Sequence, residues 1–230
     1  MRYLCIIPAR CNSKSIPFKN IVDLCNKPLI AYTIEAVLEL KIKNLISDFI
    51  VSTDCKEIAD VAKNYGAEVP FLRPKKIAED KAKSVDYVLN SINYYEGIGI
   101  KFDAVLILQP TSPLKSFKDI EKSIEIFNKN EKDSLISAYR EETINKMIMY
   151  RKENDVAIPL NNEHNKGIRR QDYGSVYIRN GAIYITSVEY LKKERKIISD
   201  IPLIYEMSKK RSINIDTYED LELVRNLLCK

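Results

Sequence analysis

The feature that most constrains the fold is an alternation of short, mostly apolar segments with segments whose apolar residues recur every three or four positions. The first pattern indicates buried strands and the second amphipathic helices. Strands are predicted over residues 3–8, 48–52, 68–72, 104–108, 134–138, 182–186 and 213–215, and helices over 29–42, 54–63, from 84, over 119–128 and from 217. Such an alternation predicts an α/β fold with a doubly wound, mostly parallel sheet covered on both faces.

The length and composition set the domain count. The chain has 230 residues, of which 45% are hydrophobic, enough for one large domain with a substantial core. From about residue 140 to 177 the rhythm breaks into short apolar pieces between charged and asparagine-rich stretches. We predict a single domain over residues 1–230, with a β-rich excursion at about 140–177.

The charge pattern excludes several classes of protein. The 37 basic and 32 acidic residues are scattered, so the net charge of +5 suits a small anion and not a nucleic acid. No apolar run approaches the ~18 to 20 residues that cross a bilayer, and the N-terminus is too polar for a secretory signal. We expect a cytoplasmic protein that binds neither membrane nor nucleic acid.

Cysteine and histidine usage argues against several kinds of site. The five cysteines are odd in number and form no C-x-x-C pair, so we predict reduced thiols and neither a disulfide framework nor a zinc site. Cys5 is expected in the core and Cys11 is expected to be a bystander in a polar loop. The only histidine, His164, lies in a polar stretch, which argues against a Ser-His-Asp triad or a multi-histidine metal site.

The loop after the first strand has the composition of a phosphate site. In a doubly wound fold the ligand binds beyond the carboxyl ends of the strands. The segment 9–20 reads ARCNSKSIPFKN and places Arg10, Lys14 and Lys19 beside small polar residues whose backbone N–H groups can face phosphate oxygens. It is neither a Walker loop nor a G-x-G-x-x-G motif, and a solvated cationic loop is the alternative.

Two further strand ends carry polar groups. Gln109 heads the proline-stiffened segment QPTSPL, where its amide can read a pyrimidine edge, although an ordinary rigid turn is the alternative. Near the C-terminus, Asn214 and Asp216 share one face of the predicted last strand. Asp216 is interpreted as a Mg²⁺ ligand or as a helix cap, a role for which Thr217 competes.

Together these segments resemble the acylneuraminate cytidylyltransferase family, the CMP-sialic acid synthetases and their relatives that activate legionaminic and pseudaminic acids. The resemblance spans nearly the whole chain and is carried by IIPARCNSKSIPFKN, KPLIAYTIEA, IVSTD, YGAEVPFLRP, LQPTSPL, NGAIY and SINIDTYEDL. CMP-Kdo synthetases share the fold, but their opening loop lacks the NSK and KN elements. The resemblance implies a Rossmann-like nucleotidyltransferase fold and the transfer of CMP from CTP to the anomeric hydroxyl of an acidic nine-carbon sugar, releasing pyrophosphate for cell-surface glycan biosynthesis.

The resemblance also implies roles for individual residues. It places the triphosphate and nucleotide on Arg10, Asn12, Ser13, Lys14, Lys19, Asn20, Arg73 and Ser84. It places the sugar on Gln109, Lys146, Arg169, Arg170 and Gln171. Mg²⁺ or Mn²⁺ would be held by Asp216 and Asn214, and the catalytic set would be Lys14, Arg10 and Asp216. The irregular middle segment corresponds to a dimerisation arm that contributes to the partner's active site, which implies a homodimer.

The chain departs from the family pattern at three places. Cys11, Asn12 and Ser15 stand where many relatives have glycine, so the loop must turn with residues less tolerant of positive φ. Asn214 replaces the first of two metal-binding carboxylates, which removes one negative charge. Many relatives have an arginine two positions before the asparagine of the NGAIY motif, where this chain has Ile178. Strand alternation points Ile178 and its neighbour Arg179 to opposite faces, so a sugar contact by Arg179 stays open.

Two alternatives remain open from the residues alone. A different sugar nucleotidyltransferase would use UTP, dTTP or GTP, whereas a catalytically weakened nucleotide-binding relative is suggested by Asn214. No residue stands out as a general base, and Asp216, directly or through a metal-bound water, is the candidate.

Overall fold

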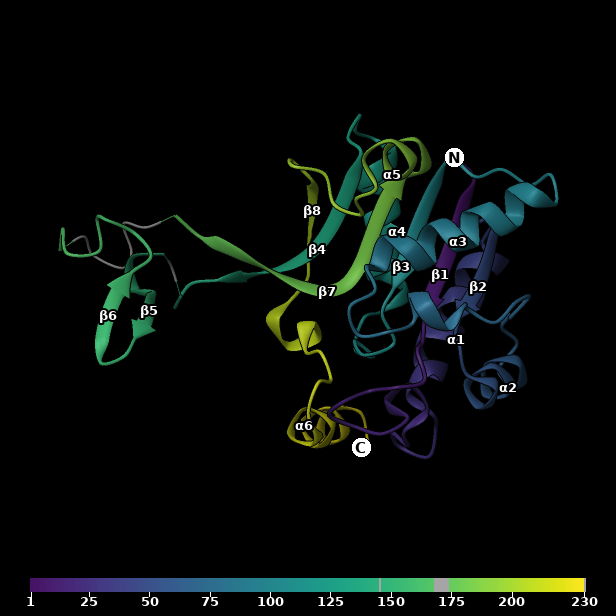
Figure 1. Cartoon of the computed structure of the whole chain (residues 1–230), viewed down its shortest axis with the longest axis horizontal. Coiled ribbons are helices and arrows are strands. Elements are labelled where there is room, and N and C mark those ends of the chain that lie inside the picture. The colour runs from purple at the N-terminus through teal and green to yellow at the C-terminus, as the bar shows by residue number, and fades with distance from the viewer. Residues whose placement is uncertain (145, 168–173, 230) are drawn as a thin grey trace.

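The computed structural model describes residues 1–144, 146–167 and 174–229, and its centre is a six-stranded sheet (Figure 1). The strand order is β2-β1-β3-β7-β4-β8. The β2–β1, β1–β3 and β4–β8 pairs are parallel, whereas β7 runs antiparallel to both β3 and β4. The strands are β1 (Tyr3–Pro8), β2 (Asp48–Ser52), β3 (Ala104–Leu108), β4 (Ser134–Glu141), β7 (Val176–Ser187) and β8 (Leu203–Glu206). The predicted mostly parallel sheet is confirmed.

Helices cover both faces of this sheet because the apolar side chains of its strands alternate between two cores. Tyr3, Cys5 and Ile7 of β1 pack in one core, which receives α1 (Leu29–Ile42), α2 (Lys56–Asn64) and α4 (Phe117–Asn128). Leu4 and Ile6 pack in the other, against α3 (Ser84–Gly97) and α5 (Val188–Glu194). A third, smaller core joins α6 (Tyr218–Leu228) to the loop after β1. The doubly wound arrangement is therefore confirmed.

Two predicted strands do not form. Residues 68–72 make only a single bridge, between Ile50 and Glu68. Pro70 has no N–H group, so it cannot continue a ladder. Residues 213–215 are extended but join no strand, and Ile215 instead donates its N–H to the carbonyl of Thr111 at 2.7 Å.

The predicted helix starts are partly wrong. Cys55, not Asp54, is the N-cap of α2, and Lys83, not Ser84, is the N-cap of α3. Asp54 lies one residue too early and accepts a hydrogen bond from the backbone N–H of Cys11 at 2.9 Å. The predicted Thr217–Asp220 capping box of α6 is confirmed.

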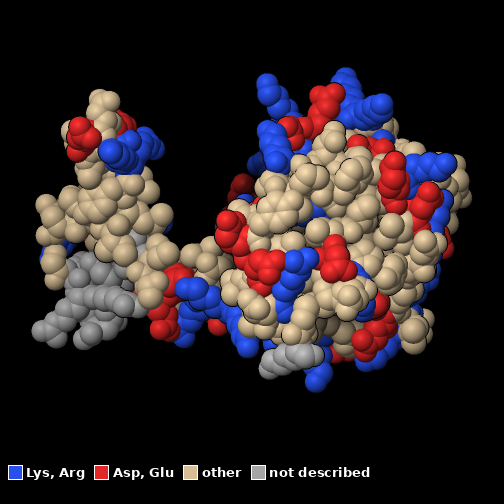
Figure 2. Space-filling view, turned by 90° about the horizontal axis from the view of Figure 1, so that it is seen from below, with Lys and Arg blue, Asp and Glu red and all other residues tan. Residues whose placement is uncertain are grey.

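Between β4 and β7 the chain leaves the main body as an arm (Figures 1 and 2). The paired ends of β4 and β7 lead outward to the short helix η3 (Lys146–Ile148) and a hairpin of β5 (Tyr150–Glu153) and β6 (Val156–Pro159). This hairpin forms its own two-stranded sheet. The excursion predicted at about 140–177 thus corresponds to a protruding β-rich segment.

The base of the arm is held to the body by an ion pair. Glu141 is 3% exposed, and its carboxylate lies 2.6 Å from Lys209 Nζ and accepts the N–H of Thr143 at 2.7 Å. These contacts, that of Lys209 first, lower the pKa of Glu141 from 4.5 to about 2. Folding lowers the pKa of this carboxyl group, so its ionised form stabilises the folded protein at any pH above the pKa in the unfolded chain. This stabilisation is lost as the pH falls to the pKa in the folded protein.

Glu141→Gln is therefore expected to lower the free energy of unfolding at pH 7 and to lose this effect between pH 4.5 and about 2. Urea unfolding at pH 7, 4 and 2.5 measures the difference. Glu125→Gln, on the exposed side of α4, is the matched control and should show no such pH-dependent difference. An equal destabilisation by Glu141→Gln at all three pH values would contradict the prediction.

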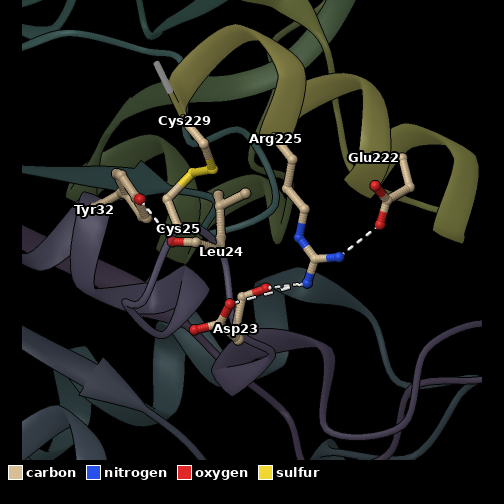
Figure 3. The surroundings of a disulfide bond; sticks show 7 residues. All are labelled: Asp23, Leu24, Cys25, Tyr32, Glu222, Arg225 and Cys229. Carbon is tan, nitrogen blue, oxygen red and sulfur yellow. Dashed lines mark hydrogen bonds and ion pairs between the residues drawn. A yellow bond between two sulfur atoms is a disulfide. The ribbon is translucent and has the colours of Figure 1, made fainter.

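A disulfide ties the end of α6 to the turn before α1 (Figure 3). Cys25 and Cys229 are bonded, with their Cα atoms 5.5 Å apart, so the prediction that all thiols are reduced is wrong for this pair. Beside it, Arg225 donates to the carbonyl of Asp23 at 2.8 Å, and the Tyr32 hydroxyl donates to the carbonyl of Leu24 at 2.7 Å. The two cysteines are 204 positions apart, and only the fold brings them together.

Candidate active site

A cleft of about 430 Å³ opens at the carboxyl ends of β1 and β3. Its walls are the loop after β1, the segment 73–84, the turn after β3, the middle of β7 and the segment before α6. Nine of the residues predicted from the sequence line it: Arg10, Ser13, Lys19, Asn20, Arg73, Ser84, Gln109, Asn214 and Asp216.

Lys19 joins the opening loop to the C-terminal segment. Its Nζ donates to the carbonyl of Ile215 and to Asp216 Oδ1, each at 3.0 Å. The Lys19 side chain is 13% exposed, whereas that of Asp216 is 68% exposed, so the ammonium is held in the wall and the carboxylate faces the open cleft. The two ends of the chain therefore meet at one site.

The opening loop turns without using its replaced glycine positions. Cys11, Asn12 and Ser15 all avoid positive φ, and the left-handed residue of this loop is Phe18, at φ 51°, which precedes the short helix η1 (Lys19–Ile21). Asn20 is buried and donates to the carbonyl of Arg10 at 3.1 Å. The loop therefore reverses direction at Phe18 and is held by the hydrogen bond from Asn20 to Arg10, so it does not need glycine at positions 11, 12 and 15.

An acidic residue that the sequence did not single out holds two cations of this loop. Asp80 lies 2.6 Å from Arg10 Nη1 and 2.9 Å from Lys14 Nζ. Lys14 and Arg10, in that order, lower the pKa of the Asp80 carboxyl. Asp80 lines the cleft, so its carboxylate marks a place in the cleft where Arg10 and Lys14 together bind a negatively charged group.

Arg73 is a buried cation in the wall of the cleft. It is 5% exposed, donates through Nη2 to the carbonyl of Ser52 at 2.6 Å, and lies 4.4 Å from the centre of the Tyr87 ring. Burial lowers the pKa of its guanidinium. The side chain thus supplies positive charge from a fixed position next to the cleft.

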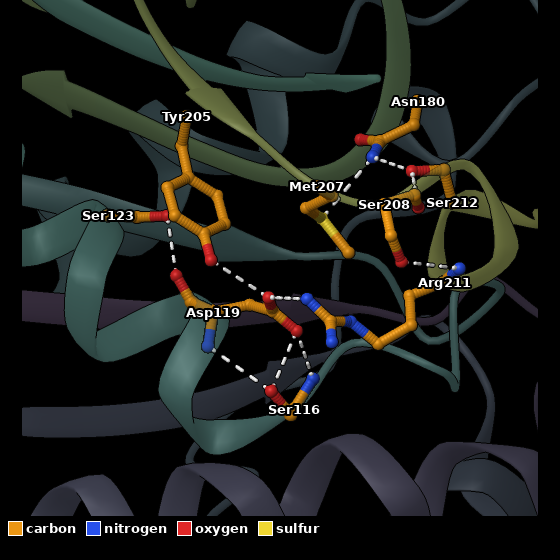
Figure 4. Close-up of polar contacts among 9 residues, drawn as sticks. All are labelled: Ser116, Asp119, Ser123, Asn180, Tyr205, Met207, Ser208, Arg211 and Ser212. Carbon is orange, nitrogen blue, oxygen red and sulfur yellow. Dashed lines mark hydrogen bonds and ion pairs between the residues drawn. The ribbon is translucent and has the colours of Figure 1, made fainter. Parts of the chain in front are cut away.

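The segment that carries Asn214 and Asp216 is positioned by a buried polar network (Figure 4). Asp119, 1% exposed, accepts hydrogen bonds from Tyr205 at 2.9 Å and from Arg211 at 2.8 Å. Nearby, Asn180 of the NGAIY motif donates to Ser212 at 2.8 Å. The network connects α4, β7 and β8 to the residues directly before Asn214.

Asn214 and Asp216 face the same side, as predicted. Asn214 donates through Nδ2 to Asp216 Oδ2 at 2.6 Å and accepts from the Ser112 hydroxyl at 3.3 Å. Thr217 caps α6, which leaves Asp216 free of the capping role. Among the residues that the structure describes, no cluster of three or more histidine, cysteine or acidic side chains is suited to a metal ion.

A buried lysine lies beneath the turn after β3. Lys115, 5% exposed, donates to Thr33 Oγ1 at 2.8 Å and to the carbonyls of Gln109 and Ser112 at 2.7 and 3.0 Å. Burial lowers the pKa of Lys115 from 10.5 to about 7. Sequence reasoning missed this residue, because a single lysine after a proline-rich turn gives no sign that it is buried.

A second cleft of about 380 Å³ adjoins the first. Four residues line both: Ser84, Tyr87, Gln109 and Tyr184. Its other lining residues include the cations Lys83, Arg179, Arg195 and Lys196, and Arg195 pairs with Asp86 at 3.2 Å. Arg179, whose contact with the sugar the sequence left open, lines this second cleft.

Several predicted residues lie elsewhere. Asn12 is exposed and Lys14 reaches the cleft only through Asp80. Lys146 lies in η3, on the arm. The predicted sugar residues Arg169, Arg170 and Gln171 fall outside the described residues. None of the helices in the described part of the chain has the length and apolar character to span a membrane.

The fold of the chain is that of solved nucleotidyltransferases. The solved CMP:2-keto-3-deoxy-manno-octonic acid synthetase in complex with CTP matches with a TM-score of 0.73 at 16% identity, over 100% of this chain and 99% of that one. A 4-diphosphocytidyl-2C-methyl-D-erythritol synthase matches with a TM-score of 0.70 at 13% identity, over 99% and 98%. At such identities the likeness shows the fold alone.

The chain belongs to the cytidylyltransferase family, whose model matches residues 4–229. It is 34% identical to the pseudaminic acid cytidylyltransferase of Campylobacter jejuni strain 81-176, over 99% of this chain and 96% of that one. It is 32% identical to the CMP-N,N'-diacetyllegionaminic acid synthase of Legionella pneumophila, over 99% and 97%. It is 30% identical to the N-acylneuraminate cytidylyltransferase of Escherichia coli O18:K1:H7, over 96% of this chain and 51% of the relative. The resemblance seen in the sequence motifs is confirmed.

Proposed function

We propose that the chain transfers CMP from CTP to the anomeric hydroxyl of a nonulosonic acid and releases pyrophosphate. The observation that carries the proposal is the convergence of the opening loop and the C-terminal aspartate, 3.0 Å apart at Lys19 and Asp216, on one cleft of about 430 Å³. The names of the relatives, which are synthetases for pseudaminic, legionaminic and acylneuraminic acids, support both substrates.

The charges of the two clefts suit the two substrates. In the first cleft Arg10, Lys19 and Arg73 would bind the triphosphate. In the second, Arg179 offers a planar guanidinium that can grip a sugar carboxylate at two points. Gln109, which lines both clefts, would orient the reacting groups where the substrates meet.

A divalent cation fits the residues at the mouth of the first cleft. Mg²⁺ commonly takes one or two protein carboxylates, substrate phosphates and several waters, and Asp216 offers an exposed carboxylate beside Asn214. Asp216 would hold Mg²⁺ or Mn²⁺, and Asn214 would join it by turning its amide oxygen, which here accepts from Ser112, towards the metal. When bound, the metal would neutralise charge on the phosphates.

The residues of the chain would stabilise the leaving group. As the sugar hydroxyl attacks the α-phosphorus in line, negative charge grows on the departing pyrophosphate. Arg10 and Lys19 would bind this charge, and Lys14 would approach from the loop above. Asp80 pairs with both Arg10 and Lys14, so a triphosphate that binds these two cations would displace its carboxylate from them.

A substrate panel tests the function. Pyrophosphate release is measured with CTP, UTP, dTTP or GTP, each combined with N-acetylneuraminic, legionaminic or pseudaminic acid. Turnover that requires CTP and one of these sugars supports the proposal. Turnover with another nucleotide would favour a different sugar nucleotidyltransferase, and nucleotide binding without turnover would favour a weakened relative.

Lys14→Ala is expected to lose most of the turnover while remaining folded. Lys14 is 77% exposed and its side-chain contact is with Asp80, so its removal should leave the core intact. Circular dichroism and thermal melting check the fold, and steady-state rates measure the loss. Near-normal activity would remove Lys14 from the mechanism.

The arm supports the proposal that the enzyme is a homodimer with shared active sites. It presents large exposed apolar side chains, a feature typical of a protein interface. These are Ile148, Met149, Tyr150, Val156, Ile158 and Leu160. Lys146, on the same arm, would then reach the sugar in the partner's second cleft.

Mixing two inactive variants tests this sharing. Lys19→Met disables a site within its own chain, whereas Lys146→Ala would disable the partner's site. An equimolar mixture that is allowed to exchange subunits should recover up to roughly a quarter of the parent activity, because half of the dimers would hold one intact site. A mixture that is no more active than the separate variants would contradict shared sites.

A further inference from the structure

Two thiols meet beneath the loop that follows β1. Cys11 lies in this loop and is partly buried, whereas Cys55, the N-cap of α2, is 2% exposed. Their Sγ atoms are 2.9 Å apart. Since a disulfide holds its sulfurs at roughly 2.05 Å, the two atoms need to approach by only about 0.9 Å.

The backbone around the two thiols keeps them together. Ala9 donates its N–H to the carbonyl of Ser52, and Cys11 donates its N–H to Asp54 Oδ1, each at 2.9 Å. The opening loop is thus bound directly to the residues that lead into α2, and the proximity of the sulfurs follows from the fold.

The two thiols differ in their surroundings. Cys11 is partly exposed whereas Cys55 is buried, so a small disulfide in solution reaches the Cys11 sulfur first. Burial, together with hydrogen bonds to Cys11 and Glu57, raises the pKa of Cys55 to about 12. The Cys55 thiol donates to Glu57 Oε2 at 3.0 Å, so a proton acceptor is already in place. The third free cysteine, Cys5, is fully buried in the core.

We propose that Cys11 and Cys55 are an oxidation site for small-molecule disulfides, and that the bond formed between them slows catalysis. The Cys11 thiolate attacks one sulfur of the oxidant, whose S–S bond breaks, and one small thiolate leaves and takes up a proton. Cys55 then gives its proton towards Glu57 and attacks Cys11 Sγ, releasing the second small thiol. Two protein thiols are oxidised, and one small disulfide is reduced to two thiols.

The bond changes the loop that carries the phosphate-binding residues. Arg10 is adjacent to Cys11, and the carbonyl of Arg10 accepts the hydrogen bond from Asn20. A movement of nearly 1 Å at Cys11 would displace this arrangement, and a misplacement of about 1 Å can cost as much as ~100-fold in rate. We expect at least a roughly tenfold loss of turnover that a dithiol reverses.

The experiment treats the full chain with excess oxidised glutathione. Non-reducing peptide mapping is expected to find a peptide that links Cys11 to Cys55, without bound glutathione, and turnover should fall and then recover with dithiothreitol. Glutathione retained on Cys11, or no reaction at either cysteine, would overturn the proposal. So would a complete Cys11–Cys55 bond that leaves turnover unchanged. The mapping needs no substrate, so its outcome is independent of the proposed transferase activity.

Three variants separate this site from the other disulfide. Cys55→Ser should trap glutathione on Cys11, whereas Cys11→Ser should make turnover insensitive to the oxidant relative to its own untreated value. Cys25→Ser, which lacks the bond to Cys229, should respond to oxidation as the parent does. A response that is lost in Cys25→Ser but kept in Cys11→Ser would assign the effect to the other pair and overturn the proposal.

Discussion

Replacing Lys19 by methionine is expected to lower kcat by at least about 100-fold, the magnitude typical of removing one preorganised group that stabilises the transition-state charge. Lys19 Nζ is held by the Ile215 carbonyl and by Asp216 in the wall of the cleft, so no water or neighbouring chain segment readily replaces it. Methionine keeps the unbranched apolar stem of the side chain and lacks the ammonium. Rapid-quench measurement of CMP transfer, together with steady-state kcat and KM, gives the effect.

The control for this variant is Lys43→Met, which removes an exposed lysine near the end of α1, paired only with Glu39 among the ion pairs of the described residues. It should be indistinguishable from the parent. If Lys19→Met raised KM for CTP alone and left kcat unchanged, Lys19 would bind the ground state and the transition state equally, and it would not act selectively on the developing pyrophosphate charge.

The second large effect is expected at Lys115. Lys115→Met would leave the carbonyls of Gln109 and Ser112 and the hydroxyl of Thr33 without the partner that now orients them. The turn that presents Gln109 to both clefts would loosen, and turnover should fall by roughly tenfold or more. The same rate assay measures it, with a circular dichroism spectrum to establish that the variant folds.

The stability of the parent protein should depend on pH through Lys115, and that of Lys115→Met should lack this dependence. Burial lowers the pKa of Lys115 from 10.5 to about 7, so between these values the unfolded chain binds a proton that the folded chain does not. The contribution of Lys115 to the free energy of unfolding therefore rises as the pH increases from about 7 towards 10.5, by an amount on the order of a few kcal/mol. Denaturant unfolding at pH 7 and 9.5 should show this rise in the parent and not in Lys115→Met. Identical pH dependence in the two proteins would contradict it.

The sequence predicted the central strands and α1 well because their patterns are unambiguous. The bounds of β1, β2, β3 and α1 are those predicted, since each strand contains a continuous apolar run and the helix repeats its apolar positions over 14 residues. β7 is longer than predicted, because its outer half pairs only with β4 in the arm and shows no continuous apolar run.

The candidate site was predictable where charge and position in the fold coincide. A cationic loop after the first strand and a carboxylate near the C-terminus were expected at one edge of the sheet, and Lys19 and Asp216 meet there. Asp80 and Lys115 were not predicted, since the partner of a charged side chain depends on tertiary contacts that leave no local pattern. The Cys25–Cys229 bond was missed for the same reason.

The Cys25–Cys229 bond closes residues 25–229 into a covalent ring. Denaturation alone leaves the ring intact, so the turn before α1 and the end of α6 remain tethered even when every other contact is lost. In the chain-entropy model, a link between residues 204 positions apart disfavours the unfolded ensemble by on the order of 5 kcal/mol. A reductant should therefore lower the thermal midpoint of this protein without touching any group in the cleft.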